Sequence, residues 1–389
     1  MKKLIAILKK ELMLTVSVAA AVIALFITPP SLSLLADIDW KTLVILFMML
    51  TVLEGFKKEN IFLPLIRLAG GIRTLTGVTF FLVFGVFFSS MFVTNDVSLI
   101  IFVPLTIIIF RAANKERLIL PVISMENIAA VRGSMLTPFG SPQNLFIFGK
   151  SGVSVWQFLL HMLPLSLLSA FLLSIFIVVI IRFGEKKTDS GSVTAYPGRK
   201  AAEESGEWKP ESRRQRIVYL CLFALVIATI VTRTPLWWLT ALIVTAAVLI
   251  FDARVLIKTD YVLLLTFFCF FIFSSSIAAN PTISDFLRRS VAGNEYWWAI
   301  GISQIISNVP ASIVLYPFTV NVSALLYGAD TAGLVTVIGS LASVINYRIY
   351  VREYPGNGLK FLKVFTCVSL AFFAFVVLPG FFLSGWHFC

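Results

Sequence analysis

The chain has 389 residues, of which 58% are hydrophobic and only 13% are charged, and its formal net charge is +12. A soluble globular domain carries roughly 25% charged residues, so this composition and a mean hydropathy of +0.93 exclude an ordinary soluble protein. The basic excess does not indicate a nucleic-acid partner. Lys and Arg lie mainly in short stretches between apolar runs, as the positive-inside rule expects of a protein in a lipid bilayer.

Apolar segments recur along the whole chain. A membrane-crossing helix needs about 20 predominantly apolar residues. In chain order the apolar segments are 12–28, 41–56, 74–92, 97–112, 118–148, 155–182, 216–232, 235–251, 260–279, 296–306, 309–327, 332–347 and 361–385. They predict an all-α polytopic membrane protein with about nine crossings.

Basic residues orient these segments. Those in the stretches 57–73 and 111–117 place both stretches on the cytoplasmic side, with the N-terminus inside. The chain between them must enter the membrane and return, either as two full crossings or as a re-entrant hairpin. The polar tip at 94–96 favours the hairpin. Continuing along the chain, the polar stretch 183–215 is expected in the cytoplasm.

Two similar polar phrases interrupt this apolar pattern. Thr94-Asn95 and Ser307-Asn308 are 213 residues apart, and a proline follows each hydroxyl residue by ten positions. Polar side chains and prolines are costly inside a bilayer unless they line a cavity or bind a ligand. The duplication indicates a transporter with two related halves and a site where the halves meet.

The order of features is the same in the two halves: two crossings, a polar-tipped hairpin, a helix with a Gly-Ser break and a last crossing. The predicted parts are a first repeat at 1–182, a linker at 183–215, a connecting helix at 216–234 and a second repeat at 235–389. The connecting helix inverts the second repeat, so its hairpin is entered from outside. Inverted repeats are a known basis for alternating access.

Four polar breaks supply the candidate ligand groups. Their hydroxyl, amide and freed carbonyl oxygens suit a small cation, and a half-helix that follows a break presents free N–H groups to an anion. The alternative is that these residues only cap turns, form an outer loop or allow close helix packing. The candidate residues are Thr94, Asn95, Asp96, Thr137, Gly140, Ser141, Gln143, Asn144, Ser307, Asn308, Gly339, Ser340 and Ser343.

Three ionisable residues are candidates for ion coupling. Asp96 has Val309 at the matching place in the second half, so a coupling acid is expected in the first half alone. Glu126 and Arg132 lie in the segment before the second break, where they are expected to pair with each other or where Arg132 faces an anionic substrate. No metal site is expected, because the four cysteines and two histidines lack metal-type spacing.

At these residues the chain resembles the ion transporter superfamily, which includes divalent anion/sodium symporters, citrate transporters, arsenite efflux permeases and some sodium/proton antiporters. Its members have a Ser/Thr-Asn signature at each of two hairpin tips. They also have a broken helix similar to the stretch from Thr137 to Asn144 and a phrase similar to Gly339-Ser340-Leu341-Ala342. The resemblance looks closest to the bacterial anion-permease or citrate-transporter-like branch, and it implies the bacterial inner membrane.

The resemblance implies that each hairpin and its broken helix form a half-site for cation and substrate. It also implies a scaffold region, often dimerising, and a transport region that moves like an elevator. The dicarboxylate symporters have a further hydroxyl residue after each Ser/Thr-Asn pair, where this chain has Asp96 and Val309. An acid beside the Asn is more similar to the arsenite permeases and antiporters.

The resulting first hypothesis is a secondary transporter of a small anion, coupled to sodium ions or protons. The second is a sodium/proton antiporter that uses Asp96 and Glu126, and the third is a channel, against which the two occluding hairpins argue. An intramembrane enzyme is not expected, since no Ser/His, paired Asp or His-Glu-x-x-His arrangement occurs. No phosphate-binding loop occurs either, so neither ATP nor another cofactor is expected.

Overall fold

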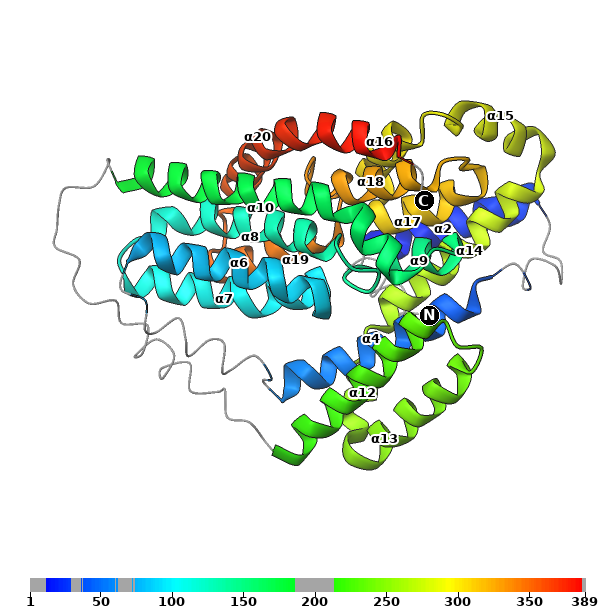
Figure 1. Cartoon of the computed structure of the whole chain (residues 1–389), viewed down its shortest axis with the longest axis horizontal. Coiled ribbons are helices and arrows are strands. Elements are labelled where there is room, and N and C mark those ends of the chain that lie inside the picture. The colour runs from blue at the N-terminus through cyan, green and yellow to red at the C-terminus, as the bar shows by residue number, and fades with distance from the viewer. Residues whose placement is uncertain are drawn as a thin grey trace.

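The structure is a computed structural model that describes residues 12–28, 36, 38–59, 61, 72, 74–185 and 213–386. Every regular element among these residues is a helix (Figure 1). The α-helices are α2 (Leu12–Ile27), α4 (Trp40–Lys58), α6 (Leu75–Val93), α7 (Asn95–Ala112), α8 (Ile119–Ser134), α9 (Pro142–Ser151), α10 (Val155–Glu185), α12 (Arg213–Thr232), α13 (Trp237–Lys258), α14 (Tyr261–Ala279), α15 (Pro281–Val291), α16 (Glu295–Ile306), α17 (Asn308–Leu315), α18 (Val322–Ala332), α19 (Leu341–Glu353) and α20 (Gly358–Ser384). Most of the predicted linker lies outside the described residues.

Seven helices in the described part of the chain are long and apolar enough to cross a membrane, namely α6, α7, α10, α12, α13, α14 and α20. The protein is therefore polytopic, as the sequence predicts. Two of these seven, α6 and α7, form the stretch for which a re-entrant hairpin is favoured, so five of the nine or so expected crossings are among the seven. Of the other expected crossings, α2 has only 16 residues, the stretch 118–148 is interrupted between α8 and α9, and the stretch 332–347 is interrupted between α18 and α19.

Two groups of three helices have the same internal packing. In the first group α6 and α7 form a helical hairpin, and both pack on α8. In the second group α16 and α17 form a shorter hairpin, and both pack on α18. A long helix then covers each group, because α10 packs on α8 and α20 packs on α18 (Figure 1).

The two groups exchange their last helices. The short helix α9 follows α8 in the chain but packs on α17 and α18 of the other group. In return α19 follows α18 but packs on α7 and α8. The two halves of the chain therefore meet along both breaks.

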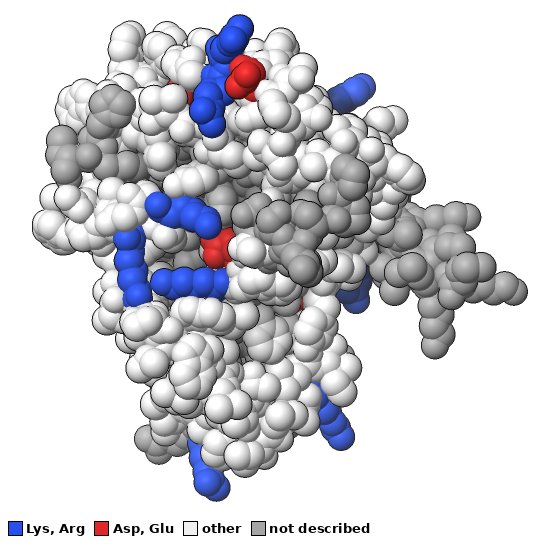
Figure 2. Space-filling view, turned by 90° about the vertical axis from the view of Figure 1, so that its right-hand side faces the viewer, with Lys and Arg blue, Asp and Glu red and all other residues white. Residues whose placement is uncertain are grey.

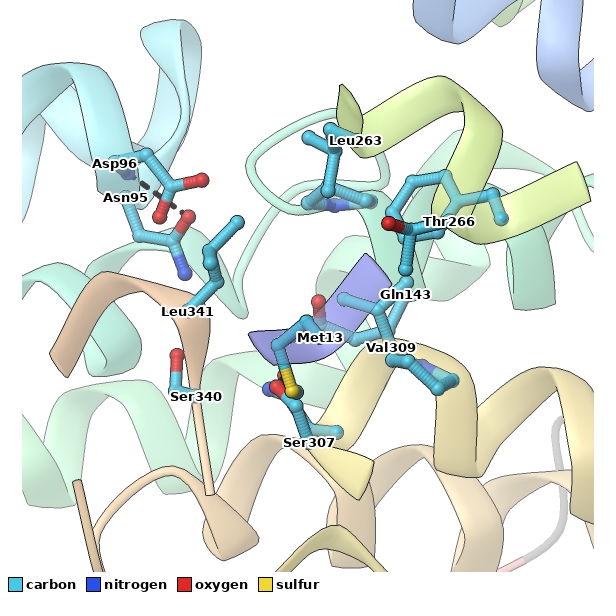
Figure 3. Close-up of a pocket in the computed structure, with 14 residues that line it drawn as sticks. Met13, Asn95, Asp96, Gln143, Leu263, Thr266, Ser307, Val309, Ser340 and Leu341 are labelled. Atoms are coloured by element: carbon cyan, nitrogen blue, oxygen red, sulfur yellow. Dashed lines mark hydrogen bonds between the residues drawn. The ribbon is translucent and has the colours of Figure 1, made fainter. Parts of the chain in front are cut away.

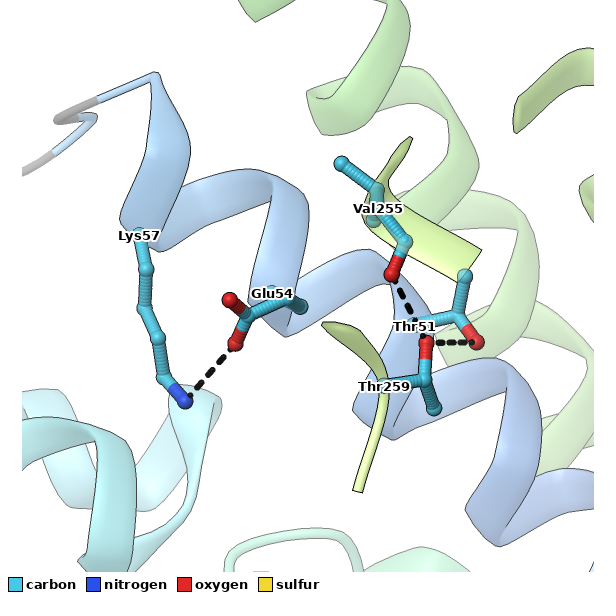
Figure 4. A network of polar contacts seen from close by, with 5 residues as sticks. All are labelled: Thr51, Glu54, Lys57, Val255 and Thr259. Carbon is cyan, nitrogen blue, oxygen red and sulfur yellow. Dashed lines mark hydrogen bonds and ion pairs between the residues drawn. The ribbon is translucent and has the colours of Figure 1, made fainter. Parts of the chain in front are cut away.

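A further bundle of α4, α12 and α13 lies beside these groups. The Thr51 hydroxyl of α4 lies 3.2 Å from the Thr259 hydroxyl, which also donates to the Val255 carbonyl (Figure 4). Two helical turns further along α4, Lys58 forms an ion pair of 2.5 Å with Asp252. Asp252 has non-helical backbone angles, so the ion pair supports a kink in α13.

The predicted segments 309–327 and 332–347 are wrong as continuous helices. The chain leaves α17 at a 3₁₀ turn, Tyr316–Phe318, and restarts as α18 after Asn321, whose side chain caps the new helix. The break then occupies 333–340 instead of lying inside one segment. Pro317 cannot donate an N–H bond in a helix interior, which explains the first interruption. The apolar segments did not predict α15, because its polar residues interrupt the hydrophobic pattern.

Candidate functional site

The turns of the two hairpins have the same backbone conformation. Thr94 joins α6 to α7 with φ 73° and ψ 153°, and Ser307 joins α16 to α17 with φ 70° and ψ 159°. A positive φ is uncommon for a residue that carries a side chain and costs of order 1–3 kcal/mol. The turns make Asn95 and Asn308 the first residues of α7 and α17.

Each hairpin is hydrogen-bonded to the helix break of its own half. The backbone N–H of Asn308 donates to the Gly339 carbonyl over 3.1 Å, and the Asn308 amide donates to the Ala329 carbonyl over 3.3 Å. In the first half the Thr137 hydroxyl donates to the Met91 carbonyl near the end of α6. Hairpin tip and break therefore form one unit in each half.

Both breaks end in a serine that precedes the next helix. Ser141 precedes α9 with φ −148° and ψ 153°, and Ser340 precedes α19 with φ −146° and ψ 141°. A glycine stands before each serine because the chain passes close to the preceding helix. A Cβ on Gly140 would lie 2.3 Å from the last carbonyl oxygen of α8, and one on Gly339 would lie 2.5 Å from that of α18.

Amide side chains satisfy the carbonyl groups that the breaks leave free. The buried Asn144 Nδ2 lies 3.3 Å from three carbonyl oxygens in the first break, those of Ser134, Met135 and Thr137. In the second break Gln304 of α16 satisfies a free carbonyl group, since its side-chain amide donates to the Ala332 carbonyl over 3.1 Å. The sequence did not indicate Gln304 as a site residue, because it belongs to neither repeated phrase.

One cavity collects residues from both halves (Figure 3). Measured as the space open to the centre of a water molecule, its volume is about 30 Å³, which is room for roughly two water molecules. Met13, Leu263, Thr266 and Phe267 of α2 and α14 form its apolar side. The other lining residues are Asn95, Asp96, Pro142, Gln143, Ser307, Asn308, Val309, Pro310, Ser340 and Leu341.

Four helix N-termini converge on this cavity. The helices α7, α9, α17 and α19 begin at Asn95, Pro142, Asn308 and Leu341, all of which line it. A helix N-terminus carries free N–H groups and about half a positive charge, which favours an anion. Two of these N-termini come from each half, so an anion in the cavity would contact both halves.

The cavity also offers oxygen atoms to a cation. The Asp96 Oδ1 and Gln143 Oε1 atoms are buried and have no hydrogen-bond partner among the described residues. The Asn95 Oδ1 atom accepts from the backbone N–H of Asp96 over 2.9 Å, which fixes the Asn95 side chain at the start of α7 (Figure 3). Carboxylate and amide oxygens are the ligands that hard cations prefer.

A buried acid that the sequence analysis missed lies directly behind the cavity. Asp330 of α18 is fully buried, and its Oδ1 accepts from the Gln143 amide over 3.0 Å. Arg132 of α8 is fully buried too, and it donates to the Asp330 carbonyl over 3.5 Å and to the Thr331 hydroxyl over 3.4 Å. The predicted segment boundaries had left Asp330 in a loop, although an acid in such an apolar stretch is a signal by itself.

The expected pairing of Glu126 with Arg132 is wrong. Glu126 accepts from the Thr106 hydroxyl of α7, whereas Arg132 contacts α18. Their six-residue separation places them on different faces of α8, because only positions three and four apart are neighbours on a helix. Neither residue lines the cavity.

The other predicted site residues lie around the cavity. Thr94 and Ser141 line a small adjoining cavity of about 20 Å³, into which Asp96 also reaches. Ser343 accepts from Asn127 of α8 over 3.0 Å, so it joins α19 to the other half. Thr137, Gly140, Asn144 and Gly339 shape the breaks, as described above.

Among known protein families, the model of the citrate transporter family matches residues 4–339. The chain belongs to the citrate transporter family. This family member is 32% identical to the inner membrane protein YbiR of Escherichia coli, over 81% of each chain. It is also 30% identical to an uncharacterized transporter of Methanocaldococcus jannaschii over 80% of this chain and 81% of the relative.

A more distant relative is an uncharacterized transporter of Mycobacterium tuberculosis, 23% identical over 90% of this chain and 88% of the relative. The family is one of transporters, the Methanocaldococcus and Mycobacterium relatives are named as transporters, and the structure supplies the helices for several crossings. This citrate transporter family protein is therefore a multi-pass membrane transporter.

Proposed function

We propose that the protein is a secondary active transporter that moves a small carboxylate or inorganic anion together with sodium ions or protons. The observation that carries the proposal is the convergence of four helix N-termini, two from each half, on one cavity. Free oxygen atoms of Asp96 and Gln143 lie in the same cavity. A cation on these oxygens offsets the charge of an anion at the N-termini, so that the loaded site is close to neutral.

The proposed mechanism is alternating access by two inverted repeats. The equal angles of Thr94 and Ser307 and the reciprocal packing of α9 and α19 support a repeat. With 12 and 8 residues, α16 and α17 are about 18 Å and 12 Å long, too short to cross a hydrocarbon core of about 30 Å. A hairpin entered from outside accounts for them. The α6–α7 hairpin is assigned to the cytoplasmic side by the repeat alone, since both of its helices are long enough to cross.

The small volume of the cavity bears on the order of events. With room for roughly two water molecules, the cavity is closed to a carboxylate in this conformation. We infer that the anion binds when the two tips separate from α2 and α14, and that the loaded site then closes. Coupling follows if only the fully loaded or the empty site crosses the membrane.

A sodium/proton antiporter is the second candidate. It is favoured by Asp96, whose carboxylate lines the cavity with an unpartnered oxygen, while Val309 stands at the matching place. In that case a proton and a sodium ion would compete for Asp96, and no organic substrate would be needed.

Transport by the purified protein in liposomes separates the two candidates. Citrate, succinate, sulfate, phosphate and arsenite would each be offered under an inward sodium gradient, an inward proton gradient or neither. Accumulation of one anion that requires a gradient supports the proposal. Sodium efflux driven by a proton gradient, with no anion accumulated, would replace it with the antiporter.

A thermal-shift screen of the detergent-solubilised protein gives an independent measurement with the same anions. Ligands that bind only the folded state raise its apparent stability. We expect stabilisation by one anion that increases when sodium is present. Stabilisation by sodium alone, opposed by protons, would again point to the antiporter.

A further inference from the structure

A second hollow, outside the central cavity, has a basic lining. Among the described residues it is lined by Lys41 of α4, Lys150 of α9 and Arg233 after α12, with Asp39 as its acid. On the same measure its volume is about 160 Å³, against 30 Å³ for the central cavity. Figure 2 shows this face, where Lys and Arg side chains gather around an acidic side chain beside a hollow.

The charges in this hollow are only partly compensated. Lys150 forms an ion pair of 3.3 Å with Asp39, which also caps α4 by accepting from Thr42. The one carboxylate cannot neutralise the remaining charges of Lys41 and Arg233. The hollow therefore has a net positive charge.

Arg233 is held in place but has an unused donor. It has a positive φ of 51°, donates to the Phe148 carbonyl over 2.7 Å and stacks its guanidinium 4.1 Å from the centre of the Phe148 ring. Its Nε atom is buried and has no hydrogen-bond partner among the described residues. A buried donor without an acceptor is unfavourable, and an oxyanion in the hollow would supply the acceptor.

The position of the hollow makes its charge unexpected. The helix α12 starts at Arg213, next to the polar linker, and its 20 residues span about 30 Å. Arg233 follows its other end, so the hollow lies on the membrane face opposite the linker. With the linker in the cytoplasm, these basic residues are outside, against the positive-inside rule. Capture of an anion gives a reason for the exception.

The hollow continues toward the central cavity along one face of α9. Gln143 lines the central cavity, Phe146 lines an adjoining chamber of about 470 Å³, and Lys150 lines both that chamber and the basic hollow. Positions three and seven apart lie on the same face of a helix. On α14, Phe267 lines the central cavity and Phe271, four positions later, lines the chamber. The central cavity, the chamber and the basic hollow thus follow one another along α9, and α14 lines the first two of them.

Three aromatic rings pack together in the wall of the chamber. Phe146 of α9 makes edge contacts with Phe271 of α14, with ring centres 5.7 Å apart, and with Tyr316 after α17, at 5.4 Å. All three line the chamber, and Phe146 and Phe271 are buried. The rings come from three helices that also line the central cavity, so a relative movement of these helices would part them.

We propose that the basic hollow and the adjoining chamber form an outer binding site for a small multivalent oxyanion, from which the anion reaches the central cavity when the three rings separate. The chemical class is a di- or tricarboxylate or an inorganic oxyanion such as phosphate. The onward passage rests on the proposed transport function. The capture of an anion does not, and it is tested separately.

A cysteine in the hollow reports its charge without any transport. Gly149 is exposed, lines the hollow, and a Cβ there would meet only the Thr42 hydroxyl at 3.7 Å, an ordinary contact. Gly149→Cys would be introduced into a protein whose own cysteines are changed to alanine, namely Cys221, Cys269, Cys367 and Cys389. The rates of its reaction with a sulfonate-bearing and a trimethylammonium-bearing methanethiosulfonate reagent are then compared, each relative to free cysteine.

We expect the anionic reagent to react roughly fivefold faster than the cationic one at low salt, because a basic hollow concentrates anions. Lys41→Gln and Arg233→Gln should each lower this ratio about twofold, and 1 M salt should remove it. Lys360→Gln, at an exposed lysine near the start of α20, is the matched control and should leave the ratio unchanged. Millimolar citrate or phosphate should protect the cysteine from both reagents.

An equal rate for both reagents, or a ratio that neither Gln substitution lowers, would overturn the outer site. Protection by micelles of phosphatidylglycerol but not by soluble citrate or phosphate would overturn it too, since the oxyanion would then be a lipid headgroup. A basic, protected hollow in a protein that accumulates no anion would instead count against the transport function alone. Anion uptake with an uncharged hollow would count against the outer site alone.

Discussion

Thr94 and Ser307 give the clearest evidence for a shared design of the two halves. Both residues take a left-handed conformation that side chains disfavour, and each is followed by the asparagine that starts the next helix. The side-chain oxygen of each asparagine then lies next to the N-terminus of the helix that it starts, α7 or α17. A cation and an anion can therefore be held next to each other.

Replacement of either asparagine should abolish transport without unfolding the protein. Asn95→Ala and Asn308→Ala each remove an amide that lines the cavity, and we expect uptake to fall at least about tenfold, which corresponds to a lost interaction of about 1.4 kcal/mol or more. Asn294→Ala is the control, since its side chain makes no cap bond at α16. Liposome uptake and the yield of folded protein are the measurements, and normal uptake in both cavity variants would refute the site.

Asp96 is the residue on which pH dependence should rest. If Asp96 carries the coupling proton, transport by the wild type should vary with pH. Asp96→Asn keeps the size of the side chain but cannot release a proton, so its residual uptake should be independent of pH. Uptake measured from pH 5 to pH 9 at a fixed sodium gradient tests this, and an unchanged pH profile in the variant excludes Asp96 as the proton carrier.

Asp330 and Arg132 should depend on each other. Both are fully buried, and Arg132 donates to the Asp330 backbone carbonyl, so each charge lies near the other and removing one leaves the other less compensated. We expect Asp330→Leu to lower the thermal midpoint strongly, Asp330→Asn to lower it less, and Asp330→Leu combined with Arg132→Leu to recover part of the loss. Additive losses in the double variant would show that the two residues do not interact.

The helix breaks depend on close backbone contact. Gly140 and Gly339 let each break fold back onto the helix before it, at distances that a side chain cannot accept. This folding brings Ser141 and Ser340 to the start of α9 and α19. The breaks therefore orient two of the four helix N-termini toward the cavity.

Gly140→Ala should lower both stability and uptake. Its new Cβ would lie 2.3 Å from a backbone oxygen that cannot move aside as a flexible side chain would, and such overpacking costs typically about 1–3 kcal/mol. The matched control is Gly301→Ala in α16, where a Cβ meets nothing within 4 Å. Thermal midpoints of the two purified variants give the comparison, and an equal effect at both positions would contradict the close contact.

The two halves of the chain are mutually dependent because each supplies a helix to the other. The helix α9 completes the group of α16, α17 and α18, and α19 completes the group of α6, α7 and α8. The central cavity accordingly takes residues from both halves. A half on its own has an incomplete site.

A chain divided within the linker should function when both parts are present. We expect fragments 1–200 and 201–389, expressed together, to copurify and restore uptake, because the described helices of each half remain intact. Either fragment alone should give no uptake. Uptake by one fragment alone would show that the site does not need both halves.

The sequence alone determined the class of the protein, most of its helices and the residues at the hairpin tips. Long apolar runs lead to membrane helices in any context, because backbone hydrogen bonds must be made inside the bilayer. The repeated Thr94-Asn95 and Ser307-Asn308 phrases, with the Pro- and Gly-rich break before α9, contain most of the polar residues that line the cavity. Local chemistry decides these features, so they are visible in the sequence.

Only the tertiary structure decided which polar residues meet. The exchange of α9 and α19 between the two groups brings Gln143 next to Asp330, 187 residues away. Arg132 of α8 likewise contacts α18 of the other half rather than Glu126. Such contacts depend on how helices pack across the whole chain, and no local pattern records that packing. The basic hollow is of the same kind, because Lys41, Lys150 and Arg233 come together only when three helices end at one face.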